Sequence, residues 1–114
     1  MIKKIAILGS TGSIGTSTLS VLYLQKNYKI KLLTTNNNVN KIYNQAIKFN
    51  VKDVIIENKK KYLKYKKLFL KKNIKLHLGL HKIETILKKK LDYTINAISG
   101  IEGLEPTLKI IPKS

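Results

Sequence analysis

The chain has 114 residues, 43% of them hydrophobic, which suits one domain with a single buried core. It contains no cysteine, so disulfides, thiolate chemistry and cysteine-bound zinc are excluded, and no stretch approaches the roughly 18 uninterrupted apolar residues of a membrane span. All 23 basic residues are lysine against six acidic residues, which gives a net charge of +17.

A basic charge of this size would suit nucleic acid or a membrane surface. However, arginine, the usual residue for bidentate contacts with phosphate and guanine, is absent. The lysines accompany many Asn and Ile residues, which indicates drift in composition. We therefore expect no specific nucleic-acid partner and no membrane. The first apolar run, residues 5–8, is too short for a signal peptide. The absence of cysteine leaves the compartment open, and the cofactor motif considered next points to a cytoplasmic protein.

The first fifteen residues, MIKKIAILGSTGSIG, combine an apolar run with three evenly spaced glycines. Residues 5–8 predict a buried parallel strand, and the apolar spacing after the glycines predicts a helix over residues 16–24. In a dinucleotide site, Gly9 would permit the tight turn, Gly12 would let the backbone approach the pyrophosphate, and Gly15 would let the helix pack closely on the strand. The helix N-terminus would add unpaired N–H groups. The alternative is a glycine turn that only connects strand and helix.

Three hydroxyl residues lie between the glycines and would add hydrogen-bond donors or a helix N-cap: Ser10, Thr11 and Ser13. Along the rest of the chain, strands are expected at residues 29–34, 53–57, 74–78 and 92–98. Helices are expected at residues 39–50, with Asn50 as C-cap, and at 59–72, 81–90 and 104–111. This alternation predicts an α/β fold, a Rossmann-like doubly wound parallel sheet in three α-β-α layers.

In such a sheet the ligand lies at the carboxyl ends of the strands, so the loops at residues 9–15, 35–38 and 97–103 should meet there. An NAD site normally carries Asp or Glu after the second strand. This chain has no carboxylate near residues 33–36, which favours NADP. Thr35 and the following asparagines can donate hydrogen bonds to a 2′-phosphate, and Lys41 can supply charge. The alternative is that the three asparagines form only a turn.

No convincing catalytic or metal-binding group emerges from the sequence. His77 and His81 are four residues apart, but Gly79 between them argues against a continuous helix, and they belong to the far side of the predicted sheet. Two aspartates precede strands and should lie at the amino edge, away from the site: Asp53 and Asp92. A pair of loop carboxylates is weak evidence for a metal: Glu102 and Glu105.

Two motifs together resemble one family. Residues 7–19 read ILGSTGSIGTSTL, and residues 96–111 read NAISGIEGLEPTLKII. This combination resembles the 1-deoxy-D-xylulose 5-phosphate reductoisomerase family. The resemblance implies an enzyme of non-mevalonate isoprenoid biosynthesis that converts this sugar phosphate to 2-C-methyl-D-erythritol 4-phosphate. It also implies NADPH and Mg²⁺ or Mn²⁺ as cofactors, and a homodimer as the full-length enzyme.

The resemblance also carries cofactor-binding residues onto this chain. The pyrophosphate positions are Thr11, Gly12, Ser13 and Ile14. The positions that hold the adenosine ribose phosphate are Asn36, Asn37 and Asn38, where the family often has glycine followed by a basic residue. The positions near the nicotinamide are Ala97, Ile98 and Gly100.

The family continues beyond this region with acidic metal ligands, a catalytic region and a C-terminal helical domain. We therefore expect residues 1–114 to be an NADPH-binding domain without catalytic or metal residues, and inactive alone. Two alternatives stay open from the residues: a stand-alone basic module for nucleotides or nucleic acid, and an NADP-dependent dehydrogenase of another family.

Overall fold

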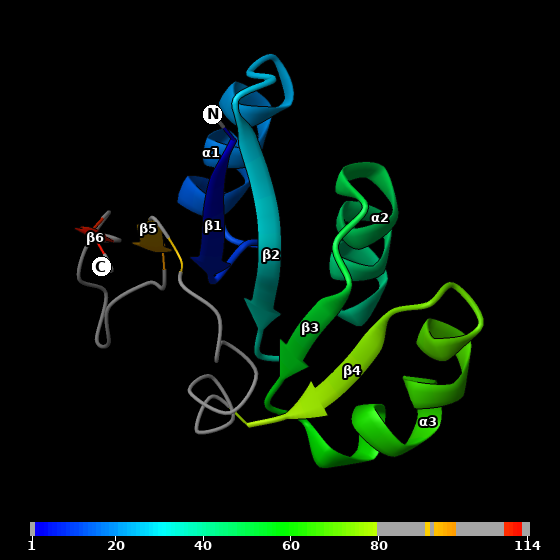
Figure 1. Cartoon of the computed structure of the whole chain (residues 1–114). Helices are drawn as coiled ribbons and strands as arrows, with labels where there is room; N and C mark the ends of the chain where they lie inside the picture. The colour runs from blue at the N-terminus through cyan, green and yellow to red at the C-terminus, as the bar shows by residue number, and fades with distance from the viewer. Residues whose placement is uncertain (1, 80–90, 92, 98–108, 113–114) are drawn as a thin grey trace, which may run out of the picture.

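The computed structural model describes residues 2–79, 91, 93–97 and 109–112, the last four by their backbone alone. Within these residues, six strands form one sheet in the order β4-β3-β2-β1-β5-β6 (Figure 1). The strands are β1 (Lys3–Leu8), β2 (Tyr28–Thr35), β3 (Asp53–Ile56), β4 (Lys75–Leu78), β5 (Tyr93–Asn96) and β6 (Lys109–Pro112). The helices are α1 (Ser13–Tyr23), α2 (Val39–Phe49) and α3 (Lys59–Leu70).

The five strands from β4 to β5 are parallel, which confirms the Rossmann-like fold. Strand β1 lies inside the sheet, paired with β2 on one side and β5 on the other. Its central residues Ile5, Ala6 and Ile7 are at most 1% exposed, as expected of a parallel strand covered on both faces. The opening of the chain therefore forms the middle of the core.

The sixth strand corrects one prediction. Residues 104–111 were expected to form a helix, but residues 109–112 form β6, antiparallel to β5. The segment reads KIIP, and its two β-branched residues suit a strand. Pro112 has no N–H to donate and is tolerated at the end of the sheet order, where one side of the strand is unpaired. The sheet is therefore mixed at this edge. Residues 104–108 lie outside the described residues.

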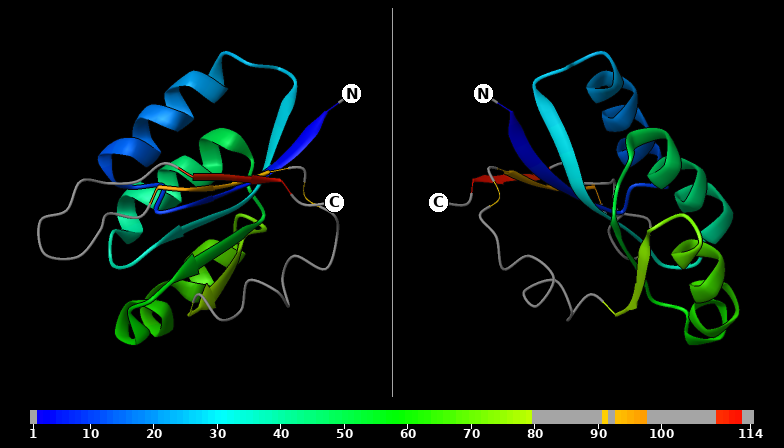
Figure 2. Two further views of the ribbon diagram at one scale, coloured as in Figure 1. Left: turned by 90° about the vertical axis from the view of Figure 1, so that its left-hand side faces the viewer. Right: turned by 45° about the vertical axis from the view of Figure 1, so that its right-hand side comes forward.

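The three described helices cover one face of the sheet (Figure 2, right). Each inserts apolar side chains into a common core, including Leu19 from α1, Ile42 from α2 and Phe69 from α3. The Tyr43 and Phe69 rings meet edge to face at 5.0 Å and join α2 to α3. The opposite face also carries a buried cluster: Ala6, Leu32, Ile55 and Leu91. The helix predicted for residues 81–90 lies outside the described residues.

Helix ends follow local chemistry. Asn50 adopts the left-handed conformation, with φ of 55°, and confirms the predicted C-cap of α2. Helix α1 begins at Ser13, three residues earlier than predicted, because Gly12 serves as its N-cap. None of the described helices is long and apolar enough to cross a membrane.

Candidate functional site: the glycine turn and the strand ends

The three glycines after β1 differ in whether the structure requires glycine at their position. Gly9 has φ of 76°, which favours glycine because a side chain would be strained there. At Gly15, a Cβ would lie 2.6 Å from Ser10 Cα and closer still to the carbonyl oxygen of Gly9, so α1 can approach the turn only without a side chain. At Gly12, neither the backbone conformation nor a close contact requires glycine. Its φ is −76°, and the nearest atom to an added Cβ is Gly9 O at 3.8 Å. Nothing inside the described chain requires glycine at Gly12.

The turn is held by β2 and α2. Ser10 N donates to Thr34 O (2.9 Å), and Gly9 N donates to Thr34 Oγ1 (2.9 Å). The Ser10 hydroxyl donates to Gln45 Oε1 (2.7 Å), and Gln45 Nε2 donates back to Ser10 O (2.9 Å). The reciprocal pair fixes the turn against α2. Ser10 is 0% exposed, so its hydroxyl does not supply the free donor that the sequence predicted.

The predicted hydroxyl cap of α1 is also wrong. The N-cap of α1 is Gly12, which has no side chain to bond the first N–H groups. By contrast, Asn38 caps α2 and Asn58 caps α3 through their side-chain oxygens. No acidic residue lies in the first turn of α1. The N-terminus of α1 thus lacks a side-chain acceptor, and its positive dipole end suits an anion.

A cavity of about 310 Å³ lies at the carboxyl ends of the parallel strands. The arrowheads of β1 to β4 mark this edge of the sheet in Figure 1. Its lining comes from the ends of β1, β2, β3 and β5: Gly9, Thr11, Gly12, Thr34, Thr35, Asn36, Asn37, Asn38, Glu57 and Ala97. The predicted meeting of the three loops is therefore confirmed at their described residues. Ala97 N donates to Leu8 O (2.8 Å), which ties the end of β5 to β1.

Six of the ten predicted cofactor positions line this cavity: Thr11, Gly12, Asn36, Asn37, Asn38 and Ala97. Ser13 and Ile14 form the first turn of α1 and are not part of the lining. Ile98 and Gly100 lie outside the described residues. The Thr11 hydroxyl is 2.6 Å from the Thr35 hydroxyl, so the glycine turn and the β2 end share a hydrogen bond across the cavity wall.

Sequence reasoning missed Glu57. This residue follows β3 directly and lines the cavity beside the asparagine loop, where Glu57 N donates to Asn36 O (3.1 Å). The available signal was a polar residue after the buried run of residues 54–56, because such a residue falls at the carboxyl edge of a parallel sheet. The strand order places β3 next to β2 and brings Glu57 to the site.

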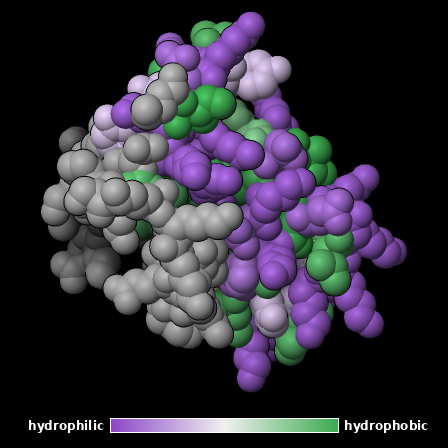
Figure 3. All heavy atoms as spheres, in the orientation of Figure 1, coloured by the Kyte–Doolittle hydropathy of each residue, from purple (hydrophilic) through white to green (hydrophobic). Residues whose placement is uncertain are grey.

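Two lysines flank the loop of Asn36, Asn37 and Asn38. Lys41 Nζ donates to Thr11 O (2.9 Å), and Lys61 Nζ donates to Asn37 O (2.8 Å). Figure 3 shows that hydrophilic side chains cover much of the described part of this face, with hydrophobic ones among them. Two ammonium groups therefore stand beside this loop, while the cavity lining itself carries the carboxylate of Glu57.

The described residues contain no cluster of three or more His, Asp or Glu that could hold a metal. His77 Nε2 lies 3.0 Å from Asp53 Oδ1, at the β3–β4 side of the sheet. Asp53 begins β3 and therefore lies at the amino edge, as predicted. The other candidates, His81, Asp92, Glu102 and Glu105, lie outside the described residues.

Comparison with known proteins gives a consistent result. Residues 5–114 match the family model described as 1-deoxy-D-xylulose 5-phosphate reductoisomerase. A relative of that name from Pelagibacter ubique is 46% identical over 112 residues, and one from Porphyromonas gingivalis is 39% identical over 113 residues. These alignments cover 96% and 97% of this chain but 29% of each relative. The chain thus spans less than a third of these relatives.

Solved structures of the same family superpose on this chain. The reductoisomerase from Zymomonas mobilis in complex with NADPH superposes with a TM-score of 0.78 and 28% identity, over 88% of this chain and 27% of that one. A DOX-P reductoisomerase in complex with NADPH, fosmidomycin and magnesium superposes with a TM-score of 0.77 and 27% identity. That alignment covers 87% of this chain and 25% of the solved chain.

Proposed function

The chain belongs to the 1-deoxy-D-xylulose 5-phosphate reductoisomerase family, and on this basis we propose that residues 1–114 form the NADPH-binding domain of such an enzyme. One observation carries the proposal. Gly12 lines the cavity, although neither its φ nor the space around it requires glycine. A ligand that approaches the backbone closely would require glycine at this position.

The pyrophosphate of NADPH would bind between Thr11 and Ile14. The backbone N–H groups at the start of α1 point toward that end of the helix axis, and no side-chain acceptor caps them. Their partial positive charge stabilises phosphate without an arginine. Gly12 permits the approach, and Ser13 adds a hydroxyl at an exposed position.

The adenosine half would lie against the end of β2 and the asparagine loop. No carboxylate stands at the end of β2, where an NAD enzyme holds the ribose hydroxyls. The amides of Asn36, Asn37 and Asn38 are exposed and can donate hydrogen bonds to the ribose and its 2′-phosphate. The nicotinamide end would pass near Ala97 and the following residues Ile98 and Gly100.

For the complete enzyme we propose the family's reaction. 1-Deoxy-D-xylulose 5-phosphate is isomerised, and the resulting aldehyde is reduced to 2-C-methyl-D-erythritol 4-phosphate, in the non-mevalonate pathway. NADPH supplies the hydride, and Mg²⁺ or Mn²⁺ is the metal cofactor. This chain would contribute cofactor binding and orientation, and the sugar-phosphate and metal residues would come from the rest of the enzyme. We also propose a cytoplasmic homodimer.

Calorimetric titration of the purified protein with NADPH and NADH tests the cofactor site, at moderate salt so that non-specific lysine contacts are screened. We expect a preference for NADPH, and loss of both ligands in Gly12→Val, with a cooperative melting curve whose Tm falls by no more than a few degrees, the cost of a poorer N-cap residue. Absence of binding in a folded wild-type protein would refute the proposal. A clear preference for NADH would refute the assignment of the cofactor.

A further inference from the structure

The loop after β2 borders the adenosine side of the cavity, yet Asn36, Asn37 and Asn38 carry no charge. A phosphate ester with two ionised oxygens is bound best where a positive charge stands within hydrogen-bond reach. If this loop receives the 2′-phosphate, as proposed above, the charge has to come from another element. The described residues beside the loop offer two lysines, Lys41 and Lys61.

A second hollow, of about 340 Å³, adjoins the first cavity. The two share Asn37 and Asn38 in their linings. The rest of the second lining comes from the start of α2 and from α3: Val39, Asn40, Lys61 and Tyr65. Its lining has amide groups, one ammonium group and no carboxylate, whereas the first cavity has Glu57. An added phosphate is attracted by the ammonium group.

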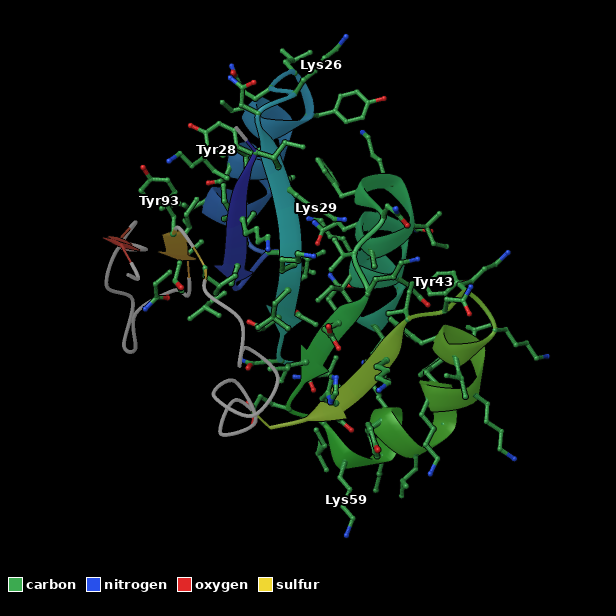
Figure 4. The ribbon with its side chains drawn as sticks, in the orientation of Figure 1. Lys26, Tyr28, Lys29, Tyr43, Lys59 and Tyr93 are labelled. Carbon is green, nitrogen blue, oxygen red and sulfur yellow. The ribbon has the colours of Figure 1, made fainter. Side chains whose placement is uncertain are left out.

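Lys61 is held at the wall of this hollow by specific contacts. Its Nζ donates to Asn37 O (2.8 Å), and Asn58 Nδ2 donates to Asn37 Oδ1 (2.9 Å). Both bonds tie the middle of the loop to α3 and its N-cap. Among the lysines of α3, Lys61 alone is partly buried. Lys59, two residues earlier on the same helix, extends into solvent (Figure 4). Lys61 is therefore distinguished by position and not by the general lysine content of the helix.

Lys41 is placed differently. Its Nζ donates to Thr11 O (2.9 Å), on the glycine-turn side of the loop, and its side chain is exposed. It does not line the second hollow. Lys41 thus adds positive charge near the pyrophosphate position, and Lys61 is the ammonium group on the side away from it.

We propose that Lys61 is the residue that selects the 2′-phosphate, and that this phosphate occupies the hollow between Asn37, Asn40 and α3. The inference rests on the proposed NADPH function of the same site. An ammonium group has three donors, of which the contact with Asn37 O uses one. The remaining donors can bind phosphate oxygens while the loop keeps its place. A basic residue from a neighbouring helix would thereby serve where the loop itself has none.

The test compares ligands that differ only by the 2′-phosphate. Adenosine 2′,5′-bisphosphate and adenosine 5′-monophosphate, and likewise NADPH and NADH, are titrated into wild type, Lys61→Gln and Lys59→Gln. The two variants lose the same charge. For Lys61→Gln we expect roughly a 3- to 10-fold weaker affinity for the 2′-phosphorylated ligands, the range of a partly exposed charge-assisted bond. We expect unchanged affinity for the other ligands, and wild-type values for Lys59→Gln.

A conservative variant sharpens the result. Lys61→Arg keeps the charge and should retain most of the preference. Equal losses in Lys61→Gln and Lys59→Gln would show a bulk charge effect and overturn the proposal, as would an unchanged ligand ratio in Lys61→Gln. If wild type binds NADPH and Gly12→Val does not, failure of the Lys61 prediction leaves the proposed function standing. If wild type binds no adenosine ligand, both fall.

Discussion

Replacing Gly15 with alanine should destabilise the fold, while the same change at Gly12 should leave stability nearly unaltered. At Gly15 the new Cβ would lie 2.6 Å from Ser10 Cα and 2.7 Å from Ser10 C. Both are backbone atoms of a turn fixed by Thr34 and Gln45, so they cannot move away independently of the core. Helix α1 would have to shift outward. Such overpacking costs typically about 1–3 kcal/mol, occasionally more.

Helix propensity favours alanine over glycine and therefore reduces the net loss of stability in Gly15→Ala. Alanine gains about 1 kcal/mol over glycine inside a helix. Because the clash involves backbone on one side and helix on the other, we take its cost at or above the top of the range, about 3 kcal/mol. The expected net loss is then about 2 kcal/mol. With an unfolding entropy of about 2.1 cal/mol/K per residue over 114 residues, this lowers the Tm by roughly 8 °C.

Thermal unfolding followed by far-ultraviolet circular dichroism measures the difference. Gly12→Ala is the matched control, because its Cβ meets only Gly9 O at 3.8 Å. We expect its Tm to stay within about 2 °C of wild type, corresponding to about 0.5 kcal/mol. A Gly15→Ala protein that melts with wild type would refute the close-approach reasoning. A larger Tm loss in Gly12→Ala than in Gly15→Ala would reverse the roles assigned to the two glycines.

Two further changes test the core and the turn. Phe69→Ala removes a 0% exposed ring that packs on Tyr43, and should cost about 3–5 kcal/mol in urea unfolding; a loss below about 1 kcal/mol would contradict the placement of α3. Ser10→Ala leaves Gln45 Oε1 without its 2.7 Å donor and should cost about 1–2 kcal/mol, while the double variant with Gln45→Leu should cost less than the two single changes combined. Additive losses would show that the two side chains act independently.

The sequence predicted the sheet well wherever local pattern and tertiary role agree. The apolar run of residues 5–8, the glycine spacing and the Asn50 cap were all recognisable, since each depends on a few neighbouring residues. The segment at residues 109–112 was predicted wrongly because its antiparallel pairing with β5, a tertiary contact that no local pattern reports, decides its conformation. The match to the family model over residues 5–114 decides against a dehydrogenase of another family, one of the two alternatives considered from the residues.

The candidate site was predicted less completely than the fold. The meeting of the loops follows from parallel topology alone, so Thr11, Asn36 and Ala97 were placed correctly at the cavity. The role of Ser10 was not predictable, because its hydroxyl is bound by Gln45, which lies 35 residues away in sequence. Glu57 was missed for a similar reason. The local pattern, a polar residue after a buried run, places it only at the carboxyl edge of the sheet, and its position beside the cavity comes from β3 lying next to β2.

The pairing of the strands implies an order of assembly during folding. Ile5 pairs with Ile30, 25 residues later, and each further strand up to β4 joins its predecessor at similar range. Ala97, by contrast, bonds to Leu8 across 89 residues. Closing the longer loop costs about 1 kcal/mol more in chain entropy. The part of the cavity lining from Gly9 to Glu57 can therefore form early, as successive strands pair. The part at Ala97 forms late, when β5 pairs with β1. Hydrogen exchange should accordingly find the β5 contact opening more readily than the β1–β2 contact.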